Sequence, residues 1–149
     1  MPAPSRETTL TVRNSCLCLR VQRASRAIGR IFDDAFRPLG LNNFQYSLLM
    51  MLNRPSPLTV GGLAECLAMD QTTISANLKP LERRRLVTIR RAAEDARVKH
   101  IVLTSAGSAL LARAVERWQT ANDAVRASIN SADLPALYSS LDTIAEAGR

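Results

Sequence analysis

Apolar residues between residues 15 and 37 recur at alternating intervals of four and three. This spacing keeps one side of a helix apolar, so it predicts one long amphipathic helix that ends near Pro38 and Gly40. Two stretches that begin near residues 105 and 134 show a similar periodicity and predict two more helices. The apolar positions of the first stripe are Leu17, Val21, Ala24, Ile28, Ile31 and Ala35.

Shorter elements are predicted in the middle of the chain. In order, we expect helices over residues 43–53, 60–67 and 70–84, then β-strands over residues 87–91 and 98–103. Asp70 is expected to cap the third of these helices by accepting a hydrogen bond from a first-turn amide. Leu58 and Thr59 fit either a short strand or the entry to a helix. The fold class is therefore mainly α (α+β), with a helix-turn-helix and a β-hairpin wing between long helices.

The segment over residues 70–84 carries the clearest chemistry. At 100° per residue Ile74, Leu78 and Leu81 fall on one side and are predicted to face the core. Hydroxyls and cations fall on the other side, where they can bind base edges and phosphates in a major groove. The alternative is a solvated helix whose cationic end suits the helix dipole. The residues predicted to contact DNA are Gln71, Thr72, Thr73, Ser75, Ala76, Lys79 and Arg83.

The predicted hairpin is basic. Arg90, Arg91 and Lys99 are expected to meet phosphates. Asp95 and Arg97 stand two apart at the turn, so Asp95 can hold Arg97 extended toward a narrow, strongly negative minor groove. The alternative is an ordinary surface ion pair, worth about 0–1 kcal/mol.

Charge and composition narrow the classes of function. The formal net charge is +7, and residues 70–100 carry eight Lys and Arg against four Asp and Glu. This balance favours a polyanionic partner. One histidine and no clustered carboxylates leave no acid–base set or nucleophilic triad, so we expect no enzyme, no cofactor and no metal. No segment approaches the roughly 18 apolar residues of a membrane span, so no membrane partner is expected.

The motifs together resemble the MarR (multiple antibiotic resistance regulator) family of winged-helix transcription factors. The matching segments are LTVGGLAECLAMDQTTISANLKPLERRRLV and EDARVKHIVLTSAG. The Asp-x-Arg pattern of the wing falls on Asp95 and Arg97, and the Leu-Thr-x-x-Gly ending falls on Leu103, Thr104 and Gly107. The resemblance implies a transcriptional regulator, most often a repressor, which binds a palindromic operator in double-stranded DNA and is released by a small aromatic or hydrophobic effector. It places the effector near Phe44, Tyr46 and the first helix.

The resemblance also implies a homodimer. The apolar stripes support a dimer independently, because they are too long to be buried by one small lobe. Residues 1–13 are expected to form a flexible arm, followed by a single domain over residues 14–149. Within that domain residues 14–40 and 105–149 are the dimerisation helices, and residues 41–104 form the winged helix-turn-helix lobe.

Cys16 and Cys18 open the first long helix. The stretch around Cys18 resembles a peroxide-sensing branch of the family, in which the cysteine is oxidised, and nearby arginines favour a thiolate. Gln22 and Phe32 stand where that branch has tyrosines, and residues two apart on a helix point apart, which disfavours a disulfide. The other interpretation is that both cysteines are buried and inert, and Cys66 is expected to lie in the core. Three cysteines form no disulfide framework, which fits the reducing cytoplasm.

Three functional hypotheses follow. The first is a dimeric DNA-binding regulator that responds to a ligand. The second is thiol-redox control of that regulator through Cys18. The third is a winged-helix protein–protein adaptor that does not bind DNA. The adaptor predicts little loss of function when Thr72, Lys79 and Arg97 are changed together.

Overall fold

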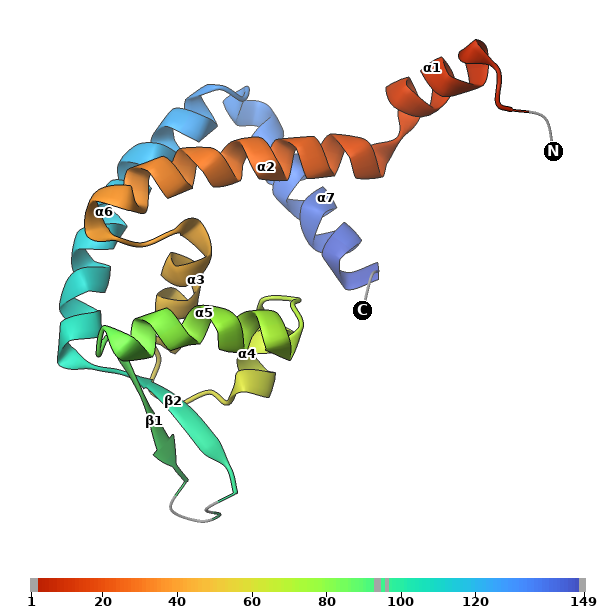
Figure 1. Ribbon diagram of the computed structural model, residues 1–149. Coiled ribbons are helices and arrows are strands. Elements are labelled where there is room, and N and C mark those ends of the chain that lie inside the picture. The colour runs from red at the N-terminus through yellow and green to blue at the C-terminus, as the bar shows by residue number, and fades with distance from the viewer. Residues whose placement is uncertain (1–2, 93–94, 96, 148–149) are drawn as a thin grey trace.

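The computed structural model describes residues 3–92, 95 and 97–147. Three long helices frame one side of the molecule, and a smaller lobe lies below the first of them (Figure 1). The framing helices are α2 (Leu17–Phe36), α6 (Ser105–Ala127) and α7 (Leu134–Ala147), with the 3-10 turns η1 (Arg37–Leu39) and η2 (Ser131–Asp133) beside them. The lobe contains α3 (Asn43–Leu52), α4 (Val60–Cys66), α5 (Gln71–Arg83), β1 (Val87–Arg91) and β2 (Lys99–Leu103). The winged helix-turn-helix predicted from the sequence is confirmed, and the predicted elements end within two residues of the observed ones.

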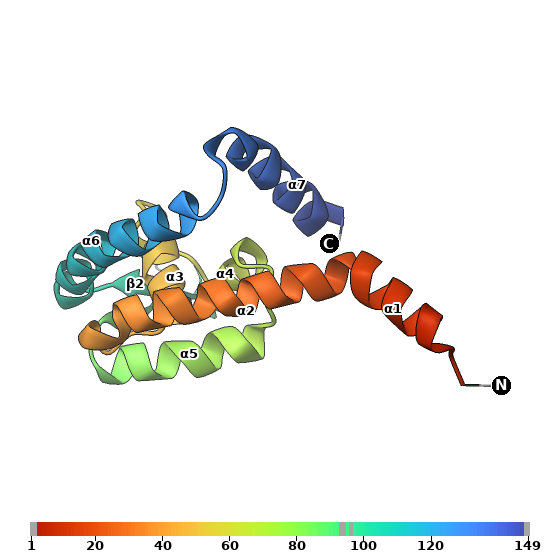
Figure 2. The ribbon, with the colours of Figure 1, turned by 90° about the horizontal axis from the view of Figure 1, so that it is seen from above.

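The N-terminal segment differs from the prediction. Instead of a flexible arm, the residues after Ser5 form helix α1 (Arg6–Ser15), which projects away from the rest of the molecule (Figures 1 and 2). The Ser5 side chain caps it by accepting a hydrogen bond from the N–H of Thr8 at 3.1 Å. Glu7 in the first turn and Arg13 in the last turn suit the helix dipole. None of its residues is buried, so local capping and charge form this helix without support from the core.

The core lies between α2, α3, α5 and the hairpin. Its fully buried side chains include Phe36, Leu48, Ile74 and Ile101. Phe36 from α2 stacks on Tyr46 from α3 with ring centroids 4.4 Å apart. The C-terminal part of α2 is therefore packed into the lobe. The N-terminal part, where Leu17 and Ile28 are exposed, is not.

Leu58 and Thr59 fulfil both of the roles that the sequence left open. Leu58 forms an isolated antiparallel bridge with Ile101, whose N–H donates to the Leu58 carbonyl at 2.8 Å. Thr59 caps α4, because its hydroxyl accepts a hydrogen bond from the N–H of Gly62 at 3.1 Å. The chain thus passes from the edge of the hairpin directly into the helix-turn-helix.

The Leu-Thr-x-x-Gly motif forms the junction between β2 and α6. The Thr104 hydroxyl donates to the carbonyl of Arg85 at 2.7 Å and accepts from the N–H of Gly107 at 3.0 Å. A Cβ atom at Gly107 would lie 2.1 Å from the carbonyl oxygen of Leu86. The third position after Thr104 therefore has room only for glycine, and α6 is seated directly on the backbone that leads into β1.

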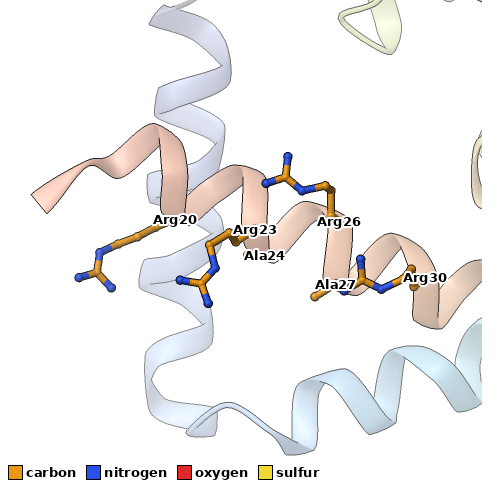
Figure 3. Close-up of a pocket in the computed structure, with 6 residues that line it drawn as sticks. All are labelled: Arg20, Arg23, Ala24, Arg26, Ala27 and Arg30. Carbon is orange, nitrogen blue, oxygen red and sulfur yellow. The ribbon is translucent and has the colours of Figure 1, made fainter. Parts of the chain in front are cut away.

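The exposed side of α2 carries four arginines, Arg20, Arg23, Arg26 and Arg30, which we call the arginine row. In Figure 3 α7 crosses behind α2, and Arg26 points to the opposite side of α2 from Arg20 and Arg23. The row lies off the apolar stripe predicted for this helix. It therefore adds a charged surface to an element that also carries exposed apolar residues.

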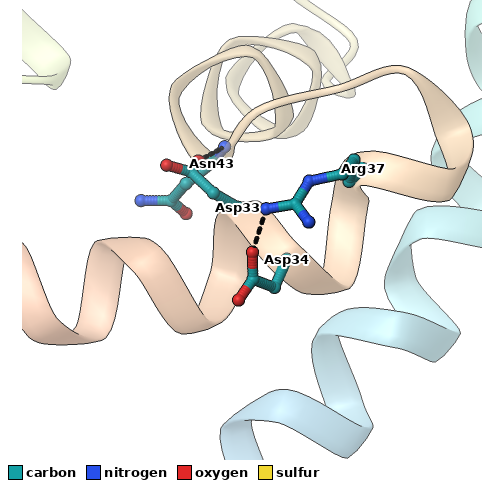
Figure 4. Close-up of polar contacts among 4 residues, drawn as sticks. All are labelled: Asp33, Asp34, Arg37 and Asn43. Carbon is teal, nitrogen blue, oxygen red and sulfur yellow. Dashed lines mark hydrogen bonds and ion pairs between the residues drawn. The ribbon is translucent and has the colours of Figure 1, made fainter.

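The connection from α2 to α3 is fixed by acidic side chains near the end of α2 (Figure 4). Asp33 Oδ1 accepts a hydrogen bond from the backbone N–H of Asn43 at 2.7 Å. Asp34 forms an ion pair with Arg37, one turn further along. The first turn of α3 is thereby attached to α2.

Among the residues that the structure describes, none of the helices combines the length and the apolar character needed to span a membrane.

Candidate nucleic-acid interface

Helix α5 begins with the cap predicted from the sequence. Asp70 Oδ1 accepts a hydrogen bond from the Thr73 N–H at 2.8 Å, and Oδ2 accepts one from the Thr73 hydroxyl at 2.7 Å. The side-chain hydrogen bond and then the backbone hydrogen bond lower the pKa of the Asp70 carboxyl below its ordinary value. Thr73 is half-buried and its hydroxyl proton is used by Asp70. It is therefore placed to order the helix start rather than to donate to a base.

The rest of α5 has the two sides that its sequence predicts. Ile74, Leu78 and Leu81 are buried in the core. The side opposite to them is exposed and carries five of the residues predicted to contact DNA, while Ser75 is half-buried beside them. We call these five exposed residues the recognition face: Gln71, Thr72, Ala76, Lys79 and Arg83.

The end of α5 is set by a residue in an unusual conformation. Arg85 has a φ of +56°, in the left-handed region that favours glycine. The N–H of Arg85 donates to the carbonyl of Glu82 at 2.8 Å, and that of Leu86 donates to the carbonyl of Leu81 at 2.9 Å. This pair of hydrogen bonds closes the helix as a Schellman motif and directs the chain into β1.

Arg84 links the end of α5 to the turn after α2. Its guanidinium donates to the carbonyl of Leu39 at 3.0 Å and to the carbonyl of Gly40. The sequence did not predict this role for Arg84, because its acceptors are backbone carbonyls more than 40 residues away. These hydrogen bonds attach the C-terminal end of α5, and with it the recognition face, to the turn that follows α2.

The hairpin places two cations opposite each other. Strands β1 and β2 are antiparallel, with Arg91 opposite Lys99. Directly opposed cations destabilise a sheet when no anion lies between them. Arg90, Arg91 and Lys99 are all exposed, so this surface is suited to an anionic partner such as a phosphate backbone.

Asp95 acts on the backbone of the wing. Its Oδ1 accepts a hydrogen bond from the backbone N–H of Arg97 at 2.8 Å. The sequence predicted that Asp95 would pair with the Arg97 guanidinium. In the structure the carboxylate instead closes a local turn through the Arg97 backbone. Arg97 itself is exposed, as its predicted DNA contact requires.

Comparisons with known proteins agree with this arrangement. A model of the MarR family matches residues 39–98. The "Organic hydroperoxide resistance transcriptional regulator" of Bacillus subtilis (strain 168) is 32% identical over 100 residues, which cover 67% of this chain and 68% of that protein. The chain belongs to the MarR family. The resemblance drawn from the sequence is confirmed, and this MarR-family protein is a transcriptional regulator, as its relatives are.

Solved structures of MarR-type regulators have the same fold. The M. tuberculosis transcriptional regulator MosR, in complex with DNA, is 34% identical with a TM-score of 0.80, and the match covers 90% of this chain and 96% of that one. The transcriptional repressor CouR, bound to a 23-mer DNA duplex, is 28% identical with a TM-score of 0.82, covering 90% and 95%. The matches include the long helices as well as the lobe.

The cysteines of this MarR-family protein lie in more open positions than the sequence suggested. Cys18 is exposed and Cys16 is half-buried, so the expectation that both thiols are buried is wrong. Cys66 is also exposed rather than in the core. Cys16 is not inside a helix. It lies between α1 and α2 with extended backbone and caps α2, with its Sγ accepting from the N–H of Leu19 at 3.4 Å. The argument that two cysteines within one helix point apart therefore does not apply to Cys16 and Cys18.

The predicted effector residues lie in the core region of the lobe. Tyr46 is only 7% exposed, and its burial raises the pKa of its hydroxyl. Phe44 is partly buried against the same core. Their role in effector binding stays a prediction. A strongly apolar cavity of about 450 Å³ lies elsewhere, between α2 and α7, and is lined by Val21, Ile28 and Leu141 among others.

Proposed function

We propose that this MarR-family regulator binds a palindromic DNA operator through α5 and the wing. The observation that carries the proposal is the exposed recognition face of α5, which is followed along the chain by the exposed cations of the hairpin. Gln71 and Thr72 at the start of α5 can meet base edges, while Lys79 and Arg83 lie further along, where phosphates border the groove. Arg97 at the wing is exposed for a contact with the adjacent minor groove.

The unit that binds DNA is proposed to be a homodimer. Large apolar side chains are exposed on α2 and α7, including Ile31 at 44% and Tyr138 at 49%. Exposed apolar surface of this extent marks an interaction site in a chain of this size. A twofold dimer would place two α5 helices about one DNA turn apart, which matches a palindrome.

An effector is proposed to control the dimer. The apolar cavity between α2 and α7 lies among the helices that are proposed to dimerise, and its lining contains neither Phe44 nor Tyr46 of the predicted site on α3. A small aromatic or hydrophobic ligand bound among these helices would alter how the two lobes are spaced. Since affinity for a palindrome depends on that spacing, such a ligand would release the DNA.

Fluorescence anisotropy on the palindromes near its own gene tests this function. The full chain is titrated into a labelled duplex and into a scrambled duplex of the same composition at low salt. We expect a clear preference for the palindrome and an affinity that falls steeply with salt. Equal binding to both duplexes, or no binding, would contradict the proposal.

A second candidate is a thiol-redox response through Cys18, and a specific observation favours it. Cys18 is exposed, with its Sγ accepting a hydrogen bond from Gln22 Nε2 at 3.3 Å, and Cys16 caps the same helix start. A hydroperoxide would oxidise the thiol to a sulfenic acid and be reduced to the alcohol. The change would occur where α1 joins α2, beside the proposed dimer interface.

Mass spectrometry after limited peroxide treatment separates this candidate from an effector-only regulator. We expect oxygen addition at Cys18 to exceed that at Cys66, which is an exposed thiol outside the α1–α2 junction, and to be absent in Cys18→Ser. DNA release should follow the oxidation in the wild type and not in the variant. Oxidation equal at both thiols, or release in Cys18→Ser, would exclude the redox response.

A further inference from the structure

The first two turns of α5 carry no charged side chain. Residues 71–78 include no Lys, Arg, Asp or Glu, although the chain as a whole is strongly basic. The first cation of the recognition face is Lys79, which lies about 10 Å along the axis from Thr72 at 1.5 Å per residue. In a helix that enters a major groove, the N-terminal turns are the ones whose side chains reach base edges. In the proposed complex the bases are therefore met by neutral side chains.

Several polar side chains of these two turns have partners within the helix or are partly covered. The Thr73 hydroxyl donates to Asp70 Oδ2 at 2.7 Å, and Asn77 Nδ2 donates to the Thr73 carbonyl at 3.0 Å. Thr73, Ser75 and Asn77 are also half-buried. These side chains hold the helix start in place and are not displayed toward a duplex.

Thr72 and Ala76 form the exposed centre of the same two turns. They are one turn apart and separated by about 40° around the axis at 100° per residue, so they lie on one face. Each presents a methyl group, and thymine displays a methyl group in the major groove. The exposed amide of Gln71 can pair with adenine, the partner of thymine. Guanine is read mainly by the paired donors of Arg or Lys, which these turns lack.

We propose that Thr72 and Ala76 determine the sequence specificity of this interface by packing their methyl groups on two thymine methyl groups in each half-site. The inference rests on the proposed DNA-binding function and deepens it, because it names the base pairs that these residues contact as A·T. A G·C pair at either position offers no methyl partner. Each such replacement should weaken binding by about 5- to 150-fold, as expected for one wrong base pair.

Removing single methyl groups from the DNA and from the protein tests this assignment. The full wild-type chain first selects its preferred sequence from duplexes that contain a randomised segment. Each thymine of the selected half-site is then replaced in turn by deoxyuridine, which lacks only the C5 methyl group. Anisotropy titrations compare the wild type with Thr72→Ser and Ala76→Gly, each of which removes one methyl group from α5. Thr120→Ser is the matched control, because it removes a methyl group from an exposed position on α6.

The expected result is a loss of affinity on deoxyuridine substitution at two thymines of each half-site. In the wild type each lost methyl group should weaken binding by about three- to fivefold, the value of one buried methyl group. The loss at one thymine should disappear in Thr72→Ser and the loss at the other in Ala76→Gly, while Thr120→Ser should keep both. Each loss is a ratio of two affinities of the same protein, so a general destabilisation of α5 in Ala76→Gly cancels.

Three results would overturn the inference. One is a wild type that binds every deoxyuridine duplex as tightly as the thymine duplex, a result that requires no variant protein. Another is that both losses persist in Thr72→Ser or in Ala76→Gly, and the third is that Thr120→Ser removes them equally. In all three the wild type still selects a palindrome, so the proposed function stands. If the wild type selects no preferred sequence, the proposed function itself has failed.

Discussion

Several polar side chains around the proposed interface form their hydrogen bonds with backbone groups. Asp70 binds the N–H of Thr73, Asp95 binds the N–H of Arg97, and Arg84 binds the carbonyls of Leu39 and Gly40. These bonds hold α5 and the wing in place while leaving the recognition face exposed. At the scale of single residues, the acidic groups of the interface thus shape the backbone and leave the cations free for phosphates.

Two variants of Asp95 distinguish a hydrogen bond to the Arg97 backbone from an ion pair with the Arg97 guanidinium. Asp95→Asn keeps the Oδ1 acceptor for the Arg97 N–H and removes a negative charge near DNA, so operator affinity should equal or exceed that of the wild type. Asp95→Ala removes the acceptor and should weaken binding by about three- to tenfold, as expected for the loss of one hydrogen bond. Anisotropy titrations measure both. If Asp95→Asn weakens binding as much as Asp95→Ala, the carboxylate acts on the Arg97 guanidinium, as the sequence first suggested.

The cap of α5 gives a pH prediction. Hydrogen bonds from Thr73 hold the pKa of Asp70 below its ordinary value, so the ionised cap stabilises the folded state above that ordinary value, about 3.9. The stabilisation is lost as the pH falls from this value toward the lower pKa of the folded state, because the unfolded chain then binds a proton that the folded chain does not. The difference in melting temperature between wild type and Asp70→Ala should therefore be largest near neutral pH and shrink toward pH 3. A difference that does not vary with pH would contradict this origin.

At the scale of helices and strands, periodicity and caps predicted the elements well. The stripe on α2, the Asp70 cap and the two β-branched runs are local signals, and each produced the expected element. The helix α1 was missed because its few apolar residues form no stripe, although Ser5 and Glu7 are helix-start signals. The exposure of Cys18 and the pairing of Arg84 were missed because both depend on which elements meet in space. Spacing along the chain carries no information about that.

The junction of β2 with α6 gives the prediction for this scale. Gly107→Ala should destabilise the protein by about 1–3 kcal/mol, because the new Cβ would lie 2.1 Å from the Leu86 carbonyl oxygen. Gly29→Ala is the matched control, since its Cβ on helix α2 would meet no atom within 4 Å. That change should stabilise the protein by about 0.5–1 kcal/mol. Urea unfolding at one fixed protein concentration measures both, and equal effects would show that the junction is not tightly packed.

At the scale of the whole molecule, the described chain has a packed lobe and a pair of helices with exposed apolar sides. Leu141 on α7 is 42% exposed and lines the cavity shared with α2. In a homodimer that pairs these helices, the Leu141 side chain of each protomer would be buried, which makes two copies per dimer. The stability of the dimer and the affinity for a palindrome should therefore change together.

Leu141→Asp tests this coupling. Burying one leucine is worth about 1.5–3 kcal/mol, so two copies predict a dimer dissociation constant raised by about 10²- to 10⁴-fold. Ser139→Asp, on the polar side of the same helix, should leave the dimer intact. Analytical ultracentrifugation measures the dissociation constant. A dimer that is equally stable in both variants would show that α7 does not form the interface.

The most direct test of the whole account is the operator affinity of a variant that combines Thr72→Ala, Lys79→Gln and Arg97→Ala. All three residues are exposed, so the fold should be retained, as circular dichroism can check. We predict that the wild type prefers the operator over a scrambled duplex by about 10³-fold or more, and that the variant loses at least about 100-fold of its operator affinity. A variant that binds the operator as tightly as the wild type would contradict DNA recognition through α5 and the wing. That result would favour a winged-helix adaptor instead.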